Sequence, residues 1–191
     1  MLLKQGDLSP DKAGEDGQTP LGLAACGGHG GVAKMLLEID EVNPDKPSND
    51  GRTPLWSAAE YGKMEVVKML LKRSEVNPDW PDNDGQTPLW PAAFFGHAEV
   101  VKMLLQRSEV NPDKPHNDGR TPLWSATLNG HTEVVKMLLQ RSEVNPDKPD
   151  DDCWAPLFSA AWNGHLEVVE MLLQGSEVNP EKPDNNGRTP L

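Results

Sequence analysis

The chain has 191 residues, with 18 Lys and Arg against 30 Asp and Glu, which gives a formal net charge of −12. This acidic excess argues against nucleic acid and anionic membranes as partners, because both attract positively charged surfaces. No apolar run approaches the roughly 20 residues that span a bilayer, and the N-terminus lacks the apolar stretch of a secretory signal. Since its two cysteines, Cys26 and Cys153, form neither a disulfide framework nor a thiolate metal site, we expect an intracellular protein, cytoplasmic or nuclear.

The chain repeats itself with a step of 34 residues. The motif Asp-Gly-x-Thr-Pro-Leu begins at Asp16 and returns, complete or altered, at Asp50, Asp84, Asp118, Asp152 and Asn186. Met-Leu-Leu keeps the same step along the chain. This register predicts one array over 1–191 that consists of a partial repeat 1–15, full repeats 16–49, 50–83, 84–117, 118–151 and 152–185, and a partial repeat 186–191.

Each repeat has the pattern of two short helices followed by a loop, as repeat 50–83 illustrates. Thr53-Pro54 predicts a helix start, because Thr caps helices and Pro fits the first helical position, and Gly62 predicts its end. Residues 65–71 predict a second helix with apolar pairs four residues apart. Residues 76–85 are rich in Pro, Asn, Asp and Gly and predict a turn or an extended hairpin. Such a unit cannot cover its own apolar face, so the units must stack.

Repeat 84–117 and the two residues before it carry the motifs that identify a family. Residues 82–97 read Asp-Asn-Asp-Gly-Gln-Thr-Pro-Leu-Trp-Pro-Ala-Ala-Phe-Phe-Gly-His, followed by Val100-Val101, Leu104-Leu105 and Val110-Asn111. This pattern recurs along essentially the whole chain and resembles the ankyrin repeat. The resemblance implies an all-α ankyrin-repeat solenoid of stacked helix-turn-helix units with β-hairpin-like fingers. It also implies a non-enzymatic scaffold that binds a protein partner through a concave groove and the fingers.

One column of the repeat is aromatic where the family pattern has His: Trp56, Trp90, Trp124 and Phe158. The identical phase of these residues predicts a continuous ladder of rings packed between repeats, since each ring buries a large apolar area. The alternative for this column is a role in ligand binding.

Two columns near the end of the first helix vary between repeats, which frees them for binding. In ankyrin repeats these columns line the concave groove, and here they hold Glu60, Tyr61, Phe94, Phe95, Leu128, Asn129, Trp162 and Asn163. The fingers add Trp80, His116 and Trp154. Aromatics confined to such columns are typical of an interaction site, because exposed apolar patches and aromatic hot spots mark binding surfaces. We expect these residues to bind a protein with a basic or apolar surface; the alternative is that the aromatics pad neighbouring repeats.

No residue pattern predicts catalysis, a metal site or a cofactor. A structural role is indicated for the histidines that recur with the repeat, His29, His97, His131 and His165. The acidic fingers resemble an EF-hand loop only superficially, since the ligand spacing and the terminal Glu are missing. Two alternatives remain open. One is a small-molecule or catalytic aromatic groove with Glu60, Tyr61 and His116 as polar groups, and the other is a fragment of a larger multidomain protein without independent activity.

Repeat 152–185 departs from the pattern at its start. Cys153 replaces the Gly expected at positive φ, and Ala155 replaces the capping Thr, whose loss costs on the order of 1 kcal/mol. Trp154 between them is either sequence drift or a residue placed for contact. Neither end of the array shows a polar cap, so we expect a piece of a longer array or end-to-end self-association.

Overall fold

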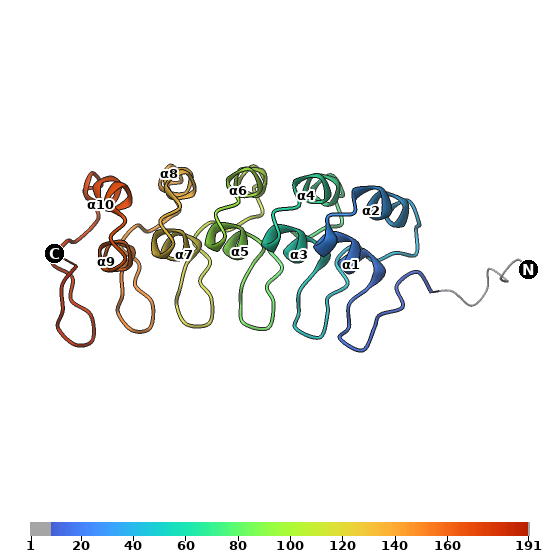
Figure 1. Ribbon diagram of the computed structural model, residues 1–191, viewed down its shortest axis with the longest axis horizontal. Helices are drawn as coiled ribbons and strands as arrows, with labels where there is room; N and C mark the ends of the chain where they lie inside the picture. The colour runs from blue at the N-terminus through green and yellow to red at the C-terminus, as the bar shows by residue number, and fades with distance from the viewer. Residues whose placement is uncertain (1–8, 191) are drawn as a thin grey trace, which may run out of the picture.

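The fold is an array of helix pairs with a row of loops along one edge (Figure 1). The computed structural model describes residues 9–190, so residues 1–8 of the partial repeat 1–15 and Leu191 of the last partial repeat lie outside the described residues. The described residues form one row of inner helices: α1 (Pro20–Gly27), α3 (Pro54–Glu60), α5 (Leu89–Phe94), α7 (Pro122–Leu128) and α9 (Pro156–Trp162). A second row contains the outer helices: α2 (Gly30–Leu37), α4 (Met64–Leu71), α6 (Ala98–Leu105), α8 (Thr132–Leu139) and α10 (Leu166–Leu173). The expected all-α solenoid of stacked helix-turn-helix units is confirmed.

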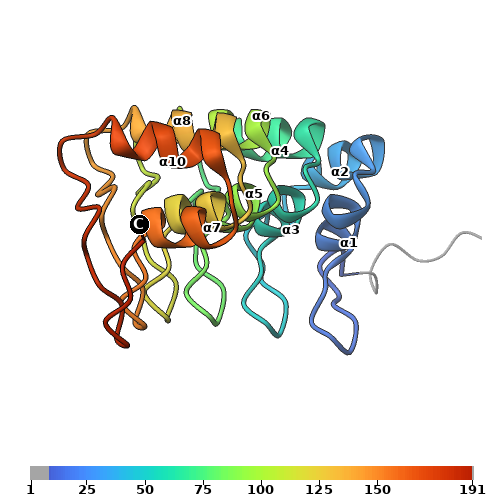
Figure 2. The same cartoon turned by 60° about the vertical axis from the view of Figure 1, so that its left-hand side comes forward.

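Fingers join consecutive helix pairs, and all of them project on the same side of the array (Figure 2). At one finger tip the Asp82 N–H donates to the Gln86 carbonyl (2.9 Å), and Gly85 takes a φ of 85°. The Asn83 N–H donates to the Asp50 carbonyl of the preceding finger (3.0 Å). The fingers are therefore hairpin-like turns tied to one another, although none of them forms a β-strand within residues 9–190.

Capping threonines start most inner helices, as the sequence predicts. The Thr53 hydroxyl accepts a hydrogen bond from the Trp56 N–H (3.2 Å). Helix α9 has no side-chain cap because Ala155 stands in the threonine position, and Cys153 takes a φ of 63° where the other fingers have Gly. The two predicted defects of repeat 152–185 are thus confirmed. Equivalent caps are made by Thr19 and Thr121.

Helix α5 begins one residue later than its counterparts, and Pro91 accounts for the difference. In two other repeats the N–H of Ser57 or Ser125 donates to the carbonyl of the capping threonine (3.0 Å each). Pro91 has no N–H to donate. The Trp90 N–H donates to the Thr87 carbonyl instead (2.9 Å), and within the described residues the Thr87 hydroxyl has no partner. This one threonine position therefore fails as a cap.

Three of the recurring histidines tie the outer helices α6, α8 and α10 to the inner helix of the preceding repeat. His97 Nε2 lies 2.9 Å from the carbonyl oxygen of Glu60. His131 and His165 make the same contact with the carbonyls of Phe94 (2.9 Å) and Leu128 (3.0 Å). The predicted structural role is confirmed for His97, His131 and His165. The carbonyls that they bind belong to the groove columns, so the histidines hold the C-terminal ends of the inner helices in register.

Candidate functional site

Three exposed aromatic side chains mark the C-terminal ends of the inner helices. Tyr61 and Phe95 follow α3 and α5 directly and are 50% and 49% exposed. Trp162 is the last residue of α9 and is 64% exposed. Because the three lie at the same end of the inner helices α3, α5 and α9, they belong to one edge of the array.

The third full repeat, 84–117, gathers a cluster of rings at this edge. Trp90 stacks on Phe94, with ring centroids 5.2 Å apart and planes 12° apart. Phe94 meets Phe95 edge to face at 5.0 Å. His116 adds a tilted contact with Trp90 at 5.6 Å. Three predicted site residues of this repeat thus come together around Trp90.

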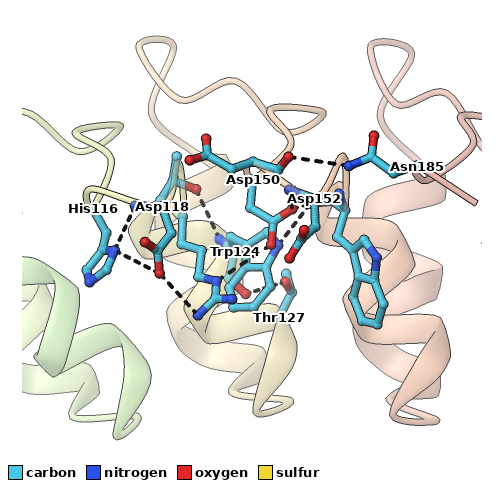
Figure 3. Close-up of polar contacts among 11 residues, drawn as sticks. His116, Asp118, Trp124, Thr127, Asp150, Asp152 and Asn185 are labelled. Atoms are coloured by element: carbon cyan, nitrogen blue, oxygen red, sulfur yellow. Dashed lines mark hydrogen bonds and ion pairs between the residues drawn. The ribbon is translucent and has the colours of Figure 1, made fainter.

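His116 organises the turn of its finger. The backbone N–H of His116 donates to the Arg120 carbonyl (2.8 Å). The ring Nδ1 of His116 accepts from the backbone N–H of Asp118 (3.0 Å), as Figure 3 shows. The ring is largely buried, so this predicted binding residue presents little of its side chain to a partner. Asp82 performs the same task in another finger, where its Oδ1 accepts from the N–H groups of Asp84 and Gln86.

The fifth full repeat, 152–185, holds a second aromatic cluster. Trp154 lies 4.6 Å from Phe158 and 5.8 Å from Trp162, measured between ring centroids. Phe158 and Trp162 are stacked at 6.4 Å, with planes 14° apart. The guanidinium carbon of Arg188 lies 5.7, 5.8 and 5.5 Å from the centroids of Trp154, Phe158 and Trp162. This cluster therefore combines two predicted site residues with a cation.

The rings of the aromatic column, Trp56, Trp90, Trp124 and Phe158, do not stack on one another in the described residues. Trp56 is buried, with Arg52 4.1 Å above its ring, and its indole N–H donates to the Gln86 carbonyl of the next finger (3.0 Å). Trp124 repeats this arrangement (Figure 3), with its indole N–H bound to the Trp154 carbonyl (2.9 Å). In the described part of the chain, ring contacts join residues of the same repeat. The predicted continuous ladder is thus wrong, because a finger separates one ring from the next.

Glu60 and Tyr61 form a polar pair at the end of α3. The Glu60 carboxylate, and to a lesser extent burial, raises the pKa of the Tyr61 hydroxyl above its ordinary value. No hydrogen bond in residues 9–190 joins this pair to His116. The three polar residues of the alternative small-molecule site, Glu60, Tyr61 and His116, therefore do not form one polar cluster.

The remaining groove candidates bond mainly within their own repeats. The amides of Asn129 and Asn163 donate to the carbonyls of Ser125 (3.0 Å) and Ser159 (2.8 Å) one turn earlier. Leu128 is half-buried between the two aromatic clusters along the chain. These three residues shape the edge between the clusters and present little apolar area of their own.

Trp80 interrupts a series of lysine–aspartate pairs that join consecutive repeats. Lys148 Nζ donates to the Asp113 carbonyl (3.0 Å) and to its Oδ2 (2.9 Å). Trp80 holds the lysine position opposite Asp45 and is partly exposed. Within residues 9–190, Trp80 makes no ring contact with the other candidates. Equivalent pairs are Lys114 with Asp79 and Lys182 with Asp147.

Two hollows of the described surface lie between outer helices. One lies between α6 and α8, lined by Ala98, Lys102 and Met137, and another lies between α4 and α6, lined by Lys68 and Met103. None of the candidate residues lines either hollow. In the same residues 9–190, no three His, Cys, Asp or Glu side chains are arranged to hold a metal ion, and no helix is long and apolar enough to cross a membrane.

Sequence reasoning missed Arg188 as a site residue and assigned Trp90 and Phe158 to the core. Phe158 is indeed buried, but all three belong to the aromatic clusters. One signal was available, since Arg and Gln alternate in a single finger column. Arg52 in this column lies over a ring four residues later, and Arg188 lies over rings of the preceding repeat.

Comparison with protein families gives one result along most of the chain. A model described as ankyrin repeats (3 copies) matches residues 1–79, 31–115 and 74–150, and one described as ankyrin repeats (many copies) matches residues 130–173. A search of curated proteins found no match.

Proposed function

The chain belongs to the ankyrin-repeat family, and from this membership we propose that it binds a protein partner along the edge where the inner helices end. Ankyrin repeats are generally protein–protein interaction modules and are typically non-enzymatic. The proposal adds the place of contact and the character of the partner.

The observation that carries the proposal is the row of exposed aromatics Tyr61, Phe95 and Trp162. Large aromatic side chains supply much of the binding energy of protein interfaces, because each buries a large apolar area with few rotatable bonds. Exposed apolar groups gathered on one edge mark an interaction surface more strongly than scattered ones do. Tyr61 adds a polar hydroxyl beside Glu60, which suits a partner with hydrogen-bonding groups next to its apolar anchors.

Charge favours a partner with basic residues. The chain carries a net charge of −12, and the finger-tip residues Asp50, Asp84, Asp118 and Asp152 are exposed. Opposite charge speeds the encounter of two proteins and is screened by salt. We therefore expect association with the partner to slow as the salt concentration rises.

The alternative small-molecule groove has less support. Glu60 and Tyr61 contact one another, and His116 is bound within its own finger. An open edge with separate rings suits the extended contact of a protein partner better than an enclosed ligand, which needs a concave pocket.

The test is a capture experiment with a matched control. The chain is used as bait beside a Tyr61→Ser, Phe95→Ser, Trp162→Ser variant and a control variant in which exposed residues of outer helix α2 are changed, Val32→Ser and Met35→Ser. Captured proteins are identified by mass spectrometry, and their direct binding to all three chains is then measured by titration. We expect a partner that binds the parent chain and the Val32→Ser, Met35→Ser control but does not bind the Tyr61→Ser, Phe95→Ser, Trp162→Ser variant. Equal binding by all three would refute it.

A further inference from the structure

An arginine, an aromatic ring and an aspartate recur together in this array. Arg52 lies 4.1 Å above the Trp56 ring, and its Nε lies 3.8 Å from the Asp82 carboxylate of the next finger. A cation over a ring and beside a carboxylate is held from both sides. The same arrangement recurs 68 residues later, with Arg120, Trp124 and Asp150.

A variant of this arrangement, in repeat 152–185, has no arginine of its own. Trp154 stands in the arginine position and Phe158 in the Trp position, while Asp184 is retained. Arg188 reaches the cluster from the following finger: its Nε donates to Asp184 Oδ2 (2.8 Å), and its terminal nitrogen lies 2.6 Å from the same oxygen. Burial opposes the charged form of Asp184, but these hydrogen bonds from Arg188 outweigh it and lower the pKa to about 2. Asp184 and Arg188 thus form a charge-assisted pair of hydrogen bonds beside the rings.

The third site shares a buried ring with the first two, since Phe158 is 3% exposed and Trp56 and Trp124 are 1% and 4% exposed. It differs from them by an additional ring that is exposed. Trp56 and Trp124 are buried beneath their arginines. In repeat 152–185 the Trp162 ring is 64% exposed and the Arg188 side chain is 46% exposed. A guanidinium from outside the chain can therefore reach the exposed Trp162 ring without disturbing the core.

We propose that Trp154, Phe158, Trp162 and Asp184 form a binding site for an arginine side chain of the protein partner, and that Arg188 occupies this site in the free chain. Three rings supply cation–π attraction and stacking, and the Asp184 carboxylate supplies the charged hydrogen-bond acceptor. The planar guanidinium matches both features, whereas a compact ammonium matches only the charge. The origin of the arginine in a partner rests on the proposed function, but the chemistry of the site does not.

The site is tested first without any partner, by NMR of the full chain. The probe is N-acetyl-arginine methylamide, and the readout is the set of indole N–H signals of the six tryptophans. In an Arg188→Ala variant we expect saturable shifts of the Trp154 and Trp162 signals, with binding to the parent about tenfold weaker because Arg188 competes. The signal of Trp56, whose indole N–H donates to the Gln86 carbonyl, serves as the internal control and stays unmoved.

Two further measurements keep the result interpretable. A Trp162→Ser change in the Arg188→Ala background alters an exposed residue, so the fold is retained and binding of the probe is lost. The lysine analogue of the probe binds more weakly. The inference is overturned if Arg188→Ala, with dispersed indole signals that show a folded chain, gives no shift confined to Trp154 and Trp162, or if the lysine analogue binds equally well.

The partner experiment separates this inference from the proposed function. If a captured partner loses affinity for the Trp162→Ser variant and contributes an arginine whose replacement has the same effect, both hold. If the partner binds and none of its arginines matters, the inference fails and the proposed function stands. If no partner binds while the probe does, the proposed function fails and the chemistry of the site stands.

Discussion

The place of Trp80 in the lysine series makes a quantitative prediction about Asp45. In the parent chain, burial and the nearby Glu75 carboxylate raise the pKa of Asp45, while a hydrogen bond from the Asn77 N–H opposes them. No cation pairs with Asp45 in the described residues, whereas its counterpart Asp113 is paired. We therefore expect Asp45→Asn to be tolerated and Asp113→Asn to be destabilising.

The magnitude follows from the geometry of the intact pair. Lys148 Nζ lies 2.9 Å from Asp113 Oδ2, and the two side chains are 32% and 13% exposed. Solvent screens such a pair, so its removal costs about 1 kcal/mol, at the upper end of surface ion pairs. Asp45→Asn has no pair to lose, keeps an oxygen for the Asn77 N–H, and removes a half-buried charge. At pH 7 its free energy of unfolding equals or exceeds that of the parent.

Thermal and denaturant unfolding of the three chains provides the assay. A difference of about 1 kcal/mol between the variants corresponds to about 2–4 °C in the midpoint for a chain of this length. The pH dependence gives a second test, because the folded chain raises the pKa of Asp45 above its value in the unfolded chain. The stability that protonated Asp45 supplies is complete below the pKa of the unfolded chain and is lost as pH rises through the higher pKa of the folded chain. Asp45→Asn therefore gains on the parent as pH rises over that range. Equal destabilisation by both substitutions at pH 7 would falsify the reasoning.

Three further predictions concern single positions. Cys153→Gly relieves a φ of 63° and raises the free energy of unfolding by about 1 kcal/mol in urea titrations; an unchanged midpoint would show that the strain is absorbed elsewhere. Since Tyr61 is the only tyrosine, its ultraviolet titration is unambiguous, and Glu60→Gln lowers its pKa towards 10.0; an unchanged pKa would exclude Glu60 as the main cause. Gly96→Ala places a Cβ 2.5 Å from His131 Nδ1 at a φ of 72°, so it lowers stability by at least about 2 kcal/mol; a neutral effect in the same titration would contradict the close approach.

The repeats could be predicted from sequence because their signals are local. Thr53-Pro54 and Gly62 mark the ends of a helix through caps and backbone preferences that act within a few residues. The same reasoning found the defects at Cys153 and Ala155, since each breaks a local rule.

The site could be predicted only in part because the contacts of Arg188 join it to residues of the preceding repeat. The exposed Tyr61, Phe95 and Trp162 follow from their column in the repeat. The position of Arg188 does not, because it depends on which side chain of the following finger turns towards the rings. Pro91 moved the start of α5, an effect that a comparison of columns does not contain.

The ties between fingers make the array respond unevenly to tension. The Asn83 amide donates to the Asn49 carbonyl at 2.9 Å, but the corresponding bond from Asn185 to Asp151 measures 3.5 Å. This looser tie lies in the repeat that also has a strained Cys153 and an uncapped inner helix. A chain stretched between its ends should unravel from this repeat first, since each unit is held only by its neighbours. An arginine bound there would stabilise this repeat and would raise the force at which the first step of unfolding occurs.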